Sequence, residues 1–357
     1  MPRFSIVIPT YNRAKFIAKS IESALNQRHD DLEVIVSDNA STDETAEVVQ
    51  RFGDRVRYHR NETNLGMWGN FALGPSLATG EYFSWLTDDD FIRNEFVARA
   101  IRGLSVGENV QLYTCWAAYT ASATSVKKYT TIHGPLFPID WLASEATIVD
   151  GLVFVPFSFF ESQAMPPAVA MRTAAAREGV KSLLPNCVQF NEYVLAAAVA
   201  ARCRVAIDPW VGVLHMYHDS QAHNLANLDK QDILRQKRAH AQFCQELIPT
   251  LPPLWKDLFR DTLNQLPVET RVALLANSDP NPEDPALFWG SAPPVVLELR
   301  NLLIASLPEG LQADLQRAYR FDCEPGLKNL VKRAIPVRIR KTVEAARWTW
   351  KSYQASS

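Results

Sequence analysis

Cysteine is scarce in this sequence, and its cysteines form no recognisable set. The chain has five in 357 residues, an odd number, and none stands in a Cys-x-x-Cys pair. This argues against a disulfide framework or a zinc site, and it favours a reducing compartment. We predict that each cysteine is a small buried apolar residue. They are Cys115, Cys187, Cys203, Cys244 and Cys323.

Long apolar runs and a strong charge of one sign are also absent. No uncharged apolar stretch approaches the roughly 18 residues that a membrane-spanning helix needs. A strand pattern that starts at Phe4 argues against a signal peptide. The formal net charge of −2 gives the chain as a whole no attraction to nucleic acid or to an anionic membrane. We therefore predict a cytoplasmic protein with no nucleic-acid partner.

Glycine-rich phosphate motifs are the third absence. The chain contains neither G-x-G-x-x-G nor G-x-x-x-x-G-K-[ST], which excludes a dinucleotide fingerprint and a P-loop. A phosphate site here would have to depend on a metal ion. The remaining composition, 47% hydrophobic and 21% charged, is ordinary for a soluble globular protein with room for about two domains.

Strand and helix patterns alternate over the first 105 residues. This order predicts an α/β fold with a doubly wound, mainly parallel sheet and helices on both faces. The spacing of Ser41 and Glu44 is that of a capping box. We expect strands at residues 4–8, 32–36, 55–59, 82–86 and 110–116, and helices at residues 14–27 and 42–51 and over about a dozen residues before Gly80.

Three consecutive carboxylates, Asp88, Asp89 and Asp90, follow the apolar strand that starts at Tyr82. The carboxyl ends of strands in open α/β sheets are where ligands bind. Carboxylate oxygens suit Mg²⁺ or Mn²⁺ bridging a substrate phosphate. The alternative is a solvated strand end, or an aspartate that caps the helix expected near Arg93.

Polar side chains at the ends of two other strands would lie along the same rim. Asp38 is placed to accept a hydrogen bond from a base ring N–H, the backbone near Thr10 to bond the base carbonyls, and Tyr11 to pack on the base. Taken singly, Asp38 also suits a turn that bonds its own backbone, and Tyr11 suits a half-buried loop.

Four segments in this order and spacing resemble the family-2 glycosyltransferases of the GT-A fold, of the bacterial polysaccharide type. The likeness is strong over about the first 105 residues and weaker to about residue 225. It implies transfer of a sugar from a nucleoside diphosphate to an acceptor hydroxyl, with inversion at the anomeric carbon. The segments are Ser5–Arg13, Glu33–Asp43, Asn64–Gly66 with Asn70, and Thr79–Tyr82 leading to Asp88–Asp90.

The resemblance also implies roles for individual residues. Thr87 stands where many relatives have aspartate, so the register within the acidic run stays open; we favour Asp88 toward the ribose or sugar, and Asp89 or Asp90 on Mn²⁺ or Mg²⁺. The residues implied for the nucleotide are Pro9, Thr10, Tyr11, Asp38, Asn64, Gly66, Asn70 and Asp88.

The second half of the predicted site lies near residues 191–218. Asn191-Glu192 takes the place of the family's Glu-Asp pair, which makes Glu192 the implied catalytic base; the alternative is a solvated acid in the first turn of a helix. His218 is the implied third metal or diphosphate contact, against an ordinary loop histidine, and His215 and His223 are assigned to structure.

The predicted domains are residues 1–225, a GT-A domain with a nucleotide-sugar part (1–105) and an acceptor part (106–225), and residues 226–357, a helical region. Its tail, 327–351, alternates basic and apolar residues with tryptophan. Such a tail suits the inner face of the cytoplasmic membrane and a lipid-linked acceptor. The alternative is a helix packed on the domain with a solvated basic face.

Donor and acceptor are left open by these residues. Asp38 suits uracil, thymine or guanine, so UDP, dTDP and GDP sugars all remain, and the acceptor is a saccharide or lipid-linked saccharide. Two alternatives to an enzyme of this type are a catalytically silent nucleotide-binding scaffold and a nucleotidyltransferase. The intact acids argue against the first, and Pro9-Thr10-Tyr11-Asn12 lacks the glycine-rich signature of the second.

Overall fold

The computed structural model describes residues 3–107, 109–120, 129–133, 137–139, 143–161, 164–216, 229–278 and 286–312. The strands are β1 (Phe4–Thr10), β2 (Leu32–Asp38), β3 (Arg57–Arg60), β4 (Tyr82–Trp85), β5 (Phe91–Ile92), β6 (Val110–Thr120), β7 (Tyr129–His133), β8 (Thr147–Asp150), β9 (Val169–Arg172) and β10 (Arg204–Met216). The helices are α1 (Ile17–Leu25), α2 (Thr45–Gln50), α3 (Met67–Leu77), α4 (Phe96–Ser105), α5 (Gly151–Phe157), α6 (Thr173–Gly179), α7 (Asn191–Ala200), α8 (Lys230–Leu247), α9 (Trp255–Gln265), α10 (Val268–Asn277), α11 (Ala286–Trp289) and α12 (Pro294–Ala305), with 3-10 turns at Gly53–Arg55, Val180–Ser182 and Ile248–Thr250.

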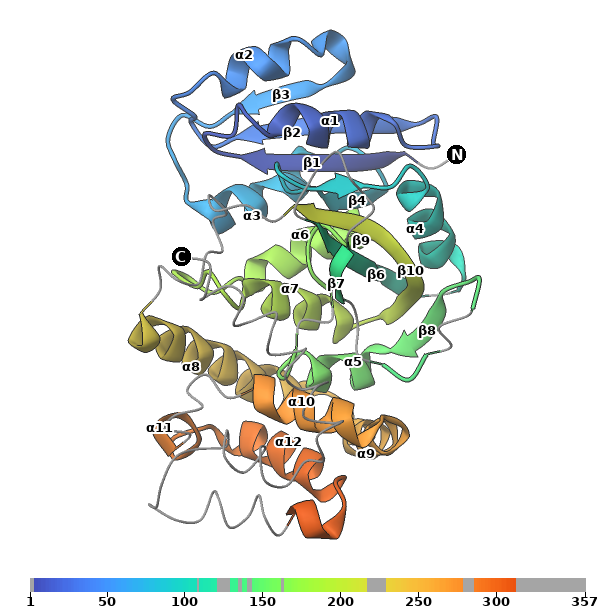
Figure 1. The fold of residues 1–357 in the computed structure, drawn as a ribbon, viewed down its shortest axis with the longest axis vertical. Coiled ribbons are helices and arrows are strands. Elements are labelled where there is room, and N and C mark those ends of the chain that lie inside the picture. Colours follow the sequence, from blue (N-terminus) through green and yellow to red (C-terminus); the bar gives the residue numbers. More distant parts are fainter. Residues whose placement is uncertain are drawn as a thin grey trace. The chain divides into compact units, whose positions relative to one another are not determined.

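The strands form one mixed sheet in the order β3-β2-β1-β4-β9-β6-β10-β5, with β7 beside β6 and β8 beside β10 (Figure 1). The first four strands are parallel, as the alternating sequence pattern predicts. Beyond β4 the sheet is mixed: β9 is antiparallel to both β4 and β6, and β10 is parallel to β6. The α/β fold class is confirmed, and the parallel arrangement belongs to its N-terminal half.

The two faces of the parallel strands pack on different helices because side chains alternate along a strand. Phe4, Ile6 and Ile8 share one buried core with Ile17 and Ile21 of α1. On the other face α3 covers the sheet.

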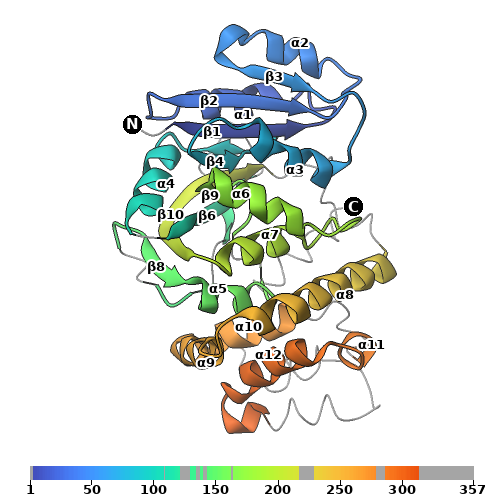
Figure 2. The ribbon, with the colours of Figure 1, turned by 180° about the vertical axis from the view of Figure 1, so that it is seen from behind.

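Contacts across that second face are aromatic. The Phe71 ring lies 6.3 Å from the Trp85 ring, and the Trp85 indole N–H donates to the Phe71 carbonyl at 2.9 Å. Figure 2 shows α3 with α6 and α7 from behind. Helices therefore cover both faces of the parallel strands.

The predicted capping box of the second helix is wrong. The helix starts at Thr45. Glu44 is the N-cap residue before it, and its side chain makes no capping hydrogen bond. The hydroxyl of Ser41 accepts the backbone N–H of Asn12 at 2.9 Å instead. Asp43 accepts the Thr45 N–H at 3.1 Å, so these residues form a loop that fastens the chain after β1.

The chain separates into two compact units. Unit 1 comprises residues 1–135, 139–154 and 162–221, and unit 2 comprises residues 136–138, 155–161 and 222–357. The core of unit 2 centres on Phe159, whose ring stacks on His240 and meets the edge of Trp289. Lys237 is buried here and donates to the Phe159 carbonyl at 2.9 Å. The aromatic residues near Phe159 are therefore part of the hydrophobic core of unit 2.

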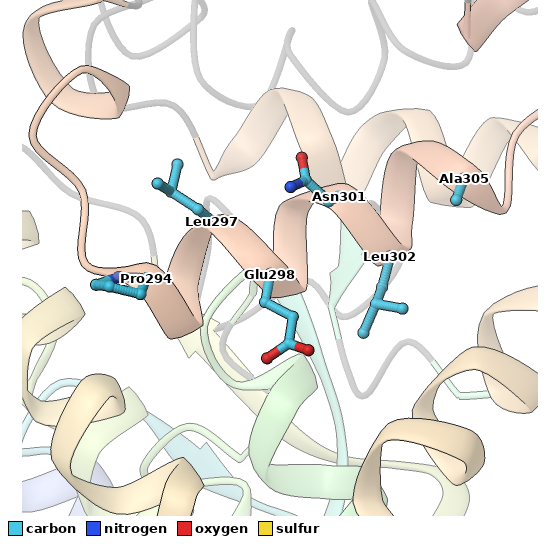
Figure 3. Close-up of a pocket in the computed structure, with 6 residues that line it drawn as sticks. All are labelled: Pro294, Leu297, Glu298, Asn301, Leu302 and Ala305. Carbon is cyan, nitrogen blue, oxygen red and sulfur yellow. The ribbon is translucent and has the colours of Figure 1, made fainter.

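A hollow of about 550 Å³ follows one side of α12 in unit 2 (Figure 3). None of the residues predicted for donor binding or catalysis lines it. Cys115, Cys187, Cys203 and Cys244 are buried as predicted, and Cys323 lies outside the described residues, as does the basic tail 327–351. In the described part of the chain, every helix is too short or too polar to span a bilayer. The lining residues of the hollow are Pro294, Leu297, Glu298, Asn301, Leu302 and Ala305.

Candidate active site

The carboxyl ends of the parallel strands lie together at one edge of the sheet. Thr10 at the end of β1 is the register partner of Asp38 at the end of β2. Just beyond β4, the N–H of Leu86 donates to the carbonyl of Val7 in β1 at 2.9 Å. The acidic run that follows Leu86 therefore starts beside β1, so the strand ends that carry the predicted site residues are neighbours.

The predicted base pocket combines two buried residues and one exposed ring. Pro9 and Thr10 are buried within β1. Tyr11 exposes 42% of its surface, which is unusual for a large apolar side chain beside a sheet core. A flat exposed ring at the strand ends offers a surface on which a nucleobase can stack, and that role stays a prediction.

Asp38 is fully buried, and several donors hold its carboxylate. The Ser41 N–H donates at 2.9 Å, the Tyr58 hydroxyl donates to the other oxygen, and the Arg60 guanidinium lies 3.3 Å from that oxygen. Burial and the hydrogen bond to Asp38 raise the pKa of Tyr58, so the phenol stays a donor. The side chain of Arg60 is 46% exposed. A base N–H that approaches Asp38 from solvent would therefore have to pass beside Arg60.

The loop from Asn61 to Gly66 is held by a network of asparagines. Asn39 accepts from the Leu65 N–H at 2.8 Å and donates to Asn64 Oδ1 at 2.8 Å. The buried amide of Asn70 accepts from Ser37 Oγ at 2.7 Å and donates to the Ser37 carbonyl at 2.8 Å. Asn70 is thus engaged inside the protein and orients the loop, while Asn64 and Gly66 form its rim.

Asp90 is buried and joins the acidic run to the end of β10. Its Oδ2 lies 2.7 Å from Nδ1 of His215 and accepts from the Thr87 hydroxyl. Its Oδ1 accepts the Met216 N–H at 2.8 Å. Burial alone would raise the pKa of Asp90, but the charge and hydrogen bond of His215 hold it below the usual range. Both oxygens of Asp90 therefore have protein partners, and we assign it to positioning.

Asp88 and Asp89 form the more open part of the run. Burial, and then the negative charge of Asp89, raise the pKa of Asp88 to about 7, and Arg13 opposes the shift. Nε of Arg13 lies 3.6 Å from Oδ1 of Asp88. Adjacent carboxylates that disfavour each other's ionisation are an arrangement that a bound cation stabilises.

Glu192 lies in the first turn of α7, and its neighbour is firmly held. The buried amide of Asn191 accepts the Leu184 N–H at 2.7 Å and donates to the Cys187 carbonyl at 2.9 Å. The charge of Glu192 acts on His215: burial lowers the pKa of His215, but the carboxylates of Asp90, Asp89 and Glu192 raise it above the usual range. His215 thus contacts the acidic run, and the charge of the predicted base acts on it.

Comparisons with known proteins bear on the fold and on the first part of the chain. Residues 5–152 match the model of glycosyl transferase family 2. The chain carries a family-2 glycosyltransferase domain. The fold neighbour TarS of S. aureus (1–349) aligns over 89% of this chain and 91% of its own, with a TM-score of 0.55 and 17% identity. The same TarS segment in complex with UDP-GlcNAc aligns with a TM-score of 0.54 and 16% identity. These likenesses show the GT-A fold.

Curated relatives match the glycosyltransferase domain over short stretches. A Campylobacter jejuni protein named GalNAc(5)-diNAcBac-PP-undecaprenol beta-1,3-glucosyltransferase is 43% identical over 94 residues, which are 25% of this chain and 30% of that protein. An uncharacterized glycosyltransferase of Haemophilus influenzae is 30% identical over 134 residues, 37% of this chain and 54% of that protein. The chain thus spans about a third to a half of the length of these relatives.

A divalent cation fits the open carboxylates of the glycosyltransferase domain. Asp88 and Asp89 supply hard oxygen ligands, and a cation between them would offset the repulsion that raises the pKa of Asp88. Among the residues that the structure describes, no three His, Cys, Asp or Glu side chains are already grouped to hold a metal ion. The remaining ligands would therefore come from substrate phosphate and water, as Mg²⁺ commonly requires.

A histidine of β10 contacts the acidic run, and the role predicted for His218 stays a prediction. His218, the residue predicted for metal or diphosphate, lies outside the described residues. His215, assigned to structure alone, is the residue that contacts Asp90. His215 lies in β10, and its contact with Asp90 depends on the strand register of β10. That register is fixed by pairing with β6, which sequence patterns do not reveal.

Proposed function

We propose that this protein is an inverting glycosyltransferase that moves a sugar from a nucleoside-diphosphate sugar to a hydroxyl of a saccharide or lipid-linked saccharide. One observation carries the proposal: Nδ1 of His215 lies 2.7 Å from Oδ2 of Asp90 in the acidic run, and the charges of Asp89 and Glu192 act on the same buried imidazole. The Campylobacter relative is a GalNAc(5)-diNAcBac-PP-undecaprenol beta-1,3-glucosyltransferase, which supports a lipid-linked saccharide as the acceptor class.

The donor nucleoside would bind between the ends of β1 and β2. Tyr11 would stack on the base, and Asp38 would accept its ring N–H beside Arg60. A carboxylate selects uracil, thymine or guanine, which carry such an N–H, over cytosine, whose ring nitrogen is an acceptor. UDP, dTDP and GDP sugars are therefore the expected donors, and CDP sugars are not.

Asp88 and Asp89 would hold the ribose and a divalent cation, Mn²⁺ or Mg²⁺. When bound, such a cation stabilises the negative charge that develops on the departing diphosphate. Asp90 keeps the run in place through His215 and the Met216 N–H rather than binding the cation itself. The loop at Asn64 and Gly66, oriented by Asn70, would lie near the ribose and diphosphate.

Glu192 would act as the general base. It would take the proton of the acceptor hydroxyl as that oxygen attacks the anomeric carbon, while the bond from this carbon to the diphosphate oxygen breaks on the opposite side. The proton passes to Glu192, and the electron pair of the broken carbon–oxygen bond leaves with the diphosphate. Attack from the opposite side inverts the anomeric centre.

The location and domain boundary follow as proposals. We propose that residues 1–225 form the catalytic domain and residues 226–357 a helical region, with the tail 327–351 contacting the inner face of the cytoplasmic membrane. Sedimentation with vesicles containing anionic lipid tests the tail: binding that persists after removal of residues 327–357 contradicts its assignment.

The test of the function is calorimetric titration with UDP, dTDP, GDP and CDP, each with Mn²⁺, with Mg²⁺ and with EDTA. We expect metal-dependent binding of one diphosphate other than CDP. Slow hydrolysis of the matching nucleotide sugar is then measured in the wild type and in Glu192→Gln. A loss of turnover of about 10²- to 10⁴-fold, with nucleotide affinity unchanged, is expected for removal of a general base.

Three other results would overturn the proposal. A folded protein that binds none of the four diphosphates has no donor site. Hydrolysis that is equal in the wild type and in Glu192→Gln removes the base assignment, and binding without any turnover favours a nucleotide-binding scaffold.

A further inference from the structure

The loop after β1 is tied to the loop after β2 by hydrogen bonds that fix its backbone. Asn12 adopts a left-handed φ of 54°, which asparagine tolerates better than most residues. Three successive backbone N–H groups donate to side chains of the neighbouring loop, and Asn12 Oδ1 accepts one N–H in return. The bonds are Asn12 N to Ser41 Oγ (2.9 Å), Arg13 N to Thr45 Oγ1 (2.9 Å), Ala14 N to Asp43 Oδ2 (3.1 Å) and Thr42 N to Asn12 Oδ1 (2.7 Å).

This anchoring delivers Arg13 to the acidic run. Its side chain is 18% exposed, that of Asp88 is 13% exposed, and Nε lies 3.6 Å from Asp88 Oδ1. The ion pair between Arg99 and Asp208, also in unit 1, is a structural pair with which this contact can be compared. Arg99 contacts the buried Asp208 with two nitrogens, at 2.6 and 2.7 Å. The Arg13 contact is longer than the 2.7–2.9 Å typical of charged hydrogen bonds, so it is the weaker of the two.

We propose that Arg13 neutralises Asp88 in the donor-free protein and then binds the diphosphate of the donor, where it stabilises the leaving group. This proposal rests on the proposed function, because it needs a nucleoside-diphosphate donor at the acidic run. It assigns a substrate-contacting role to a residue that the sequence motifs leave without one.

The charges at the site explain why Arg13 would change partner. Without ligand, Arg13 is a counter-charge for a crowded group of carboxylates. A bound divalent cation takes over that task, and the diphosphate that arrives with it offers Arg13 a second anion. Guanidinium and phosphate form strong charge-assisted bonds. Because the departing diphosphate is more negative than the intact donor, Arg13 would bind it more strongly in the transition state, which raises kcat.

The test uses Arg13→Gln and Arg13→Lys in the full-length protein. Whichever of UDP, dTDP and GDP the wild type binds is titrated with Mn²⁺ and compared with its free nucleoside, measured by saturation-transfer NMR. Arg13→Gln should weaken diphosphate binding by roughly 10- to 100-fold, the range for a bond to a charged group. Nucleoside binding should change less than about twofold, and Arg13→Lys should regain part of the loss.

The affinity for Mn²⁺ without nucleotide distinguishes a lost diphosphate contact from a damaged loop. Removing a cation beside Asp88 should leave Mn²⁺ affinity unchanged or tighter, whereas a damaged loop should weaken it. Arg55→Ala is the matched control, because Arg55 is exposed and packs on the Phe52 ring. It should leave all three affinities unchanged.

Four outcomes would overturn the assignment of Arg13. Diphosphate affinity that is unchanged in Arg13→Gln removes its contact with the donor. Equal losses for diphosphate and nucleoside, or weaker Mn²⁺ binding, show that Arg13 only holds the loop. If the wild type itself binds no nucleoside diphosphate, the proposed function fails and the Arg13 proposal falls with it, which separates the two failures.

Discussion

Asp89 and Asp90 are adjacent in sequence, and we predict that their substitutions affect different properties: nucleotide binding for Asp89 and fold stability for Asp90. Asp90 is 2% exposed and accepts hydrogen bonds from the Met216 backbone and the Thr87 hydroxyl while it pairs with His215. Asp89 is only partly buried. Asp90→Ala should therefore destabilise the fold, whereas Asp89→Ala should weaken metal-dependent nucleotide binding.

The size of the stability effect follows from what Asp90→Ala leaves behind. Removing one partner of a buried charge pair costs about 3–5 kcal/mol, because the other partner stays buried without compensation. For a unit of this size each kcal/mol lowers Tm by about 2–4 °C, so a drop of roughly 6–20 °C is expected. Asp89→Ala, at a more exposed position, should change stability by no more than about 1 kcal/mol.

The assay is thermal unfolding followed by near-ultraviolet circular dichroism in EDTA, so that no cation contributes. Titration of the same variants with Mn²⁺ and the matching nucleoside diphosphate is the second arm. Asp90→Asn is the control for shape, and it should fall between the wild type and Asp90→Ala. If Asp90→Ala melts within about 2 °C of the wild type and loses metal-dependent binding instead, then Asp90 is a metal ligand and our positioning role is refuted.

Two buried carboxylates give further predictions. Burial would raise the pKa of Glu33, but hydrogen bonds from Ser5 and Thr79 hold it below 4.5. A carboxylate with a lowered folded pKa stabilises the protein above pH 4.5 and loses that effect as pH falls. Glu33→Gln should thus lower the free energy of unfolding, measured in urea, by about 1–3 kcal/mol at pH 7 and by much less near pH 3.5. An equal loss at both pH values would contradict a role for the ionised carboxylate. Asp208→Asn, which breaks the buried pair with Arg99, should cost about 3–5 kcal/mol in the same assay, with nucleotide affinity retained.

Local patterns predicted the part of the site that follows the parallel strands. Each apolar run ends in polar residues, and parallel strands bring their carboxyl ends to one edge, so Thr10, Asp38 and the acidic run could be placed together. Patterns could not tell which polar groups are used internally. Asn70 resembles a ligand-contacting residue in sequence, yet its amide is engaged by Ser37, because a side chain's partners depend on neighbours far along the chain.

The sequence by itself determined the α/β class, the order of the first strands and helices, and the set of acids on which the proposed chemistry depends. These follow from residue type and spacing, which act over a few residues. Only the tertiary structure decided that β9 enters antiparallel between β4 and β6, and that His215 faces Asp90 across 125 residues of sequence. Such contacts depend on strand register and on the packing of distant segments, and neither leaves a periodic signal in the chain.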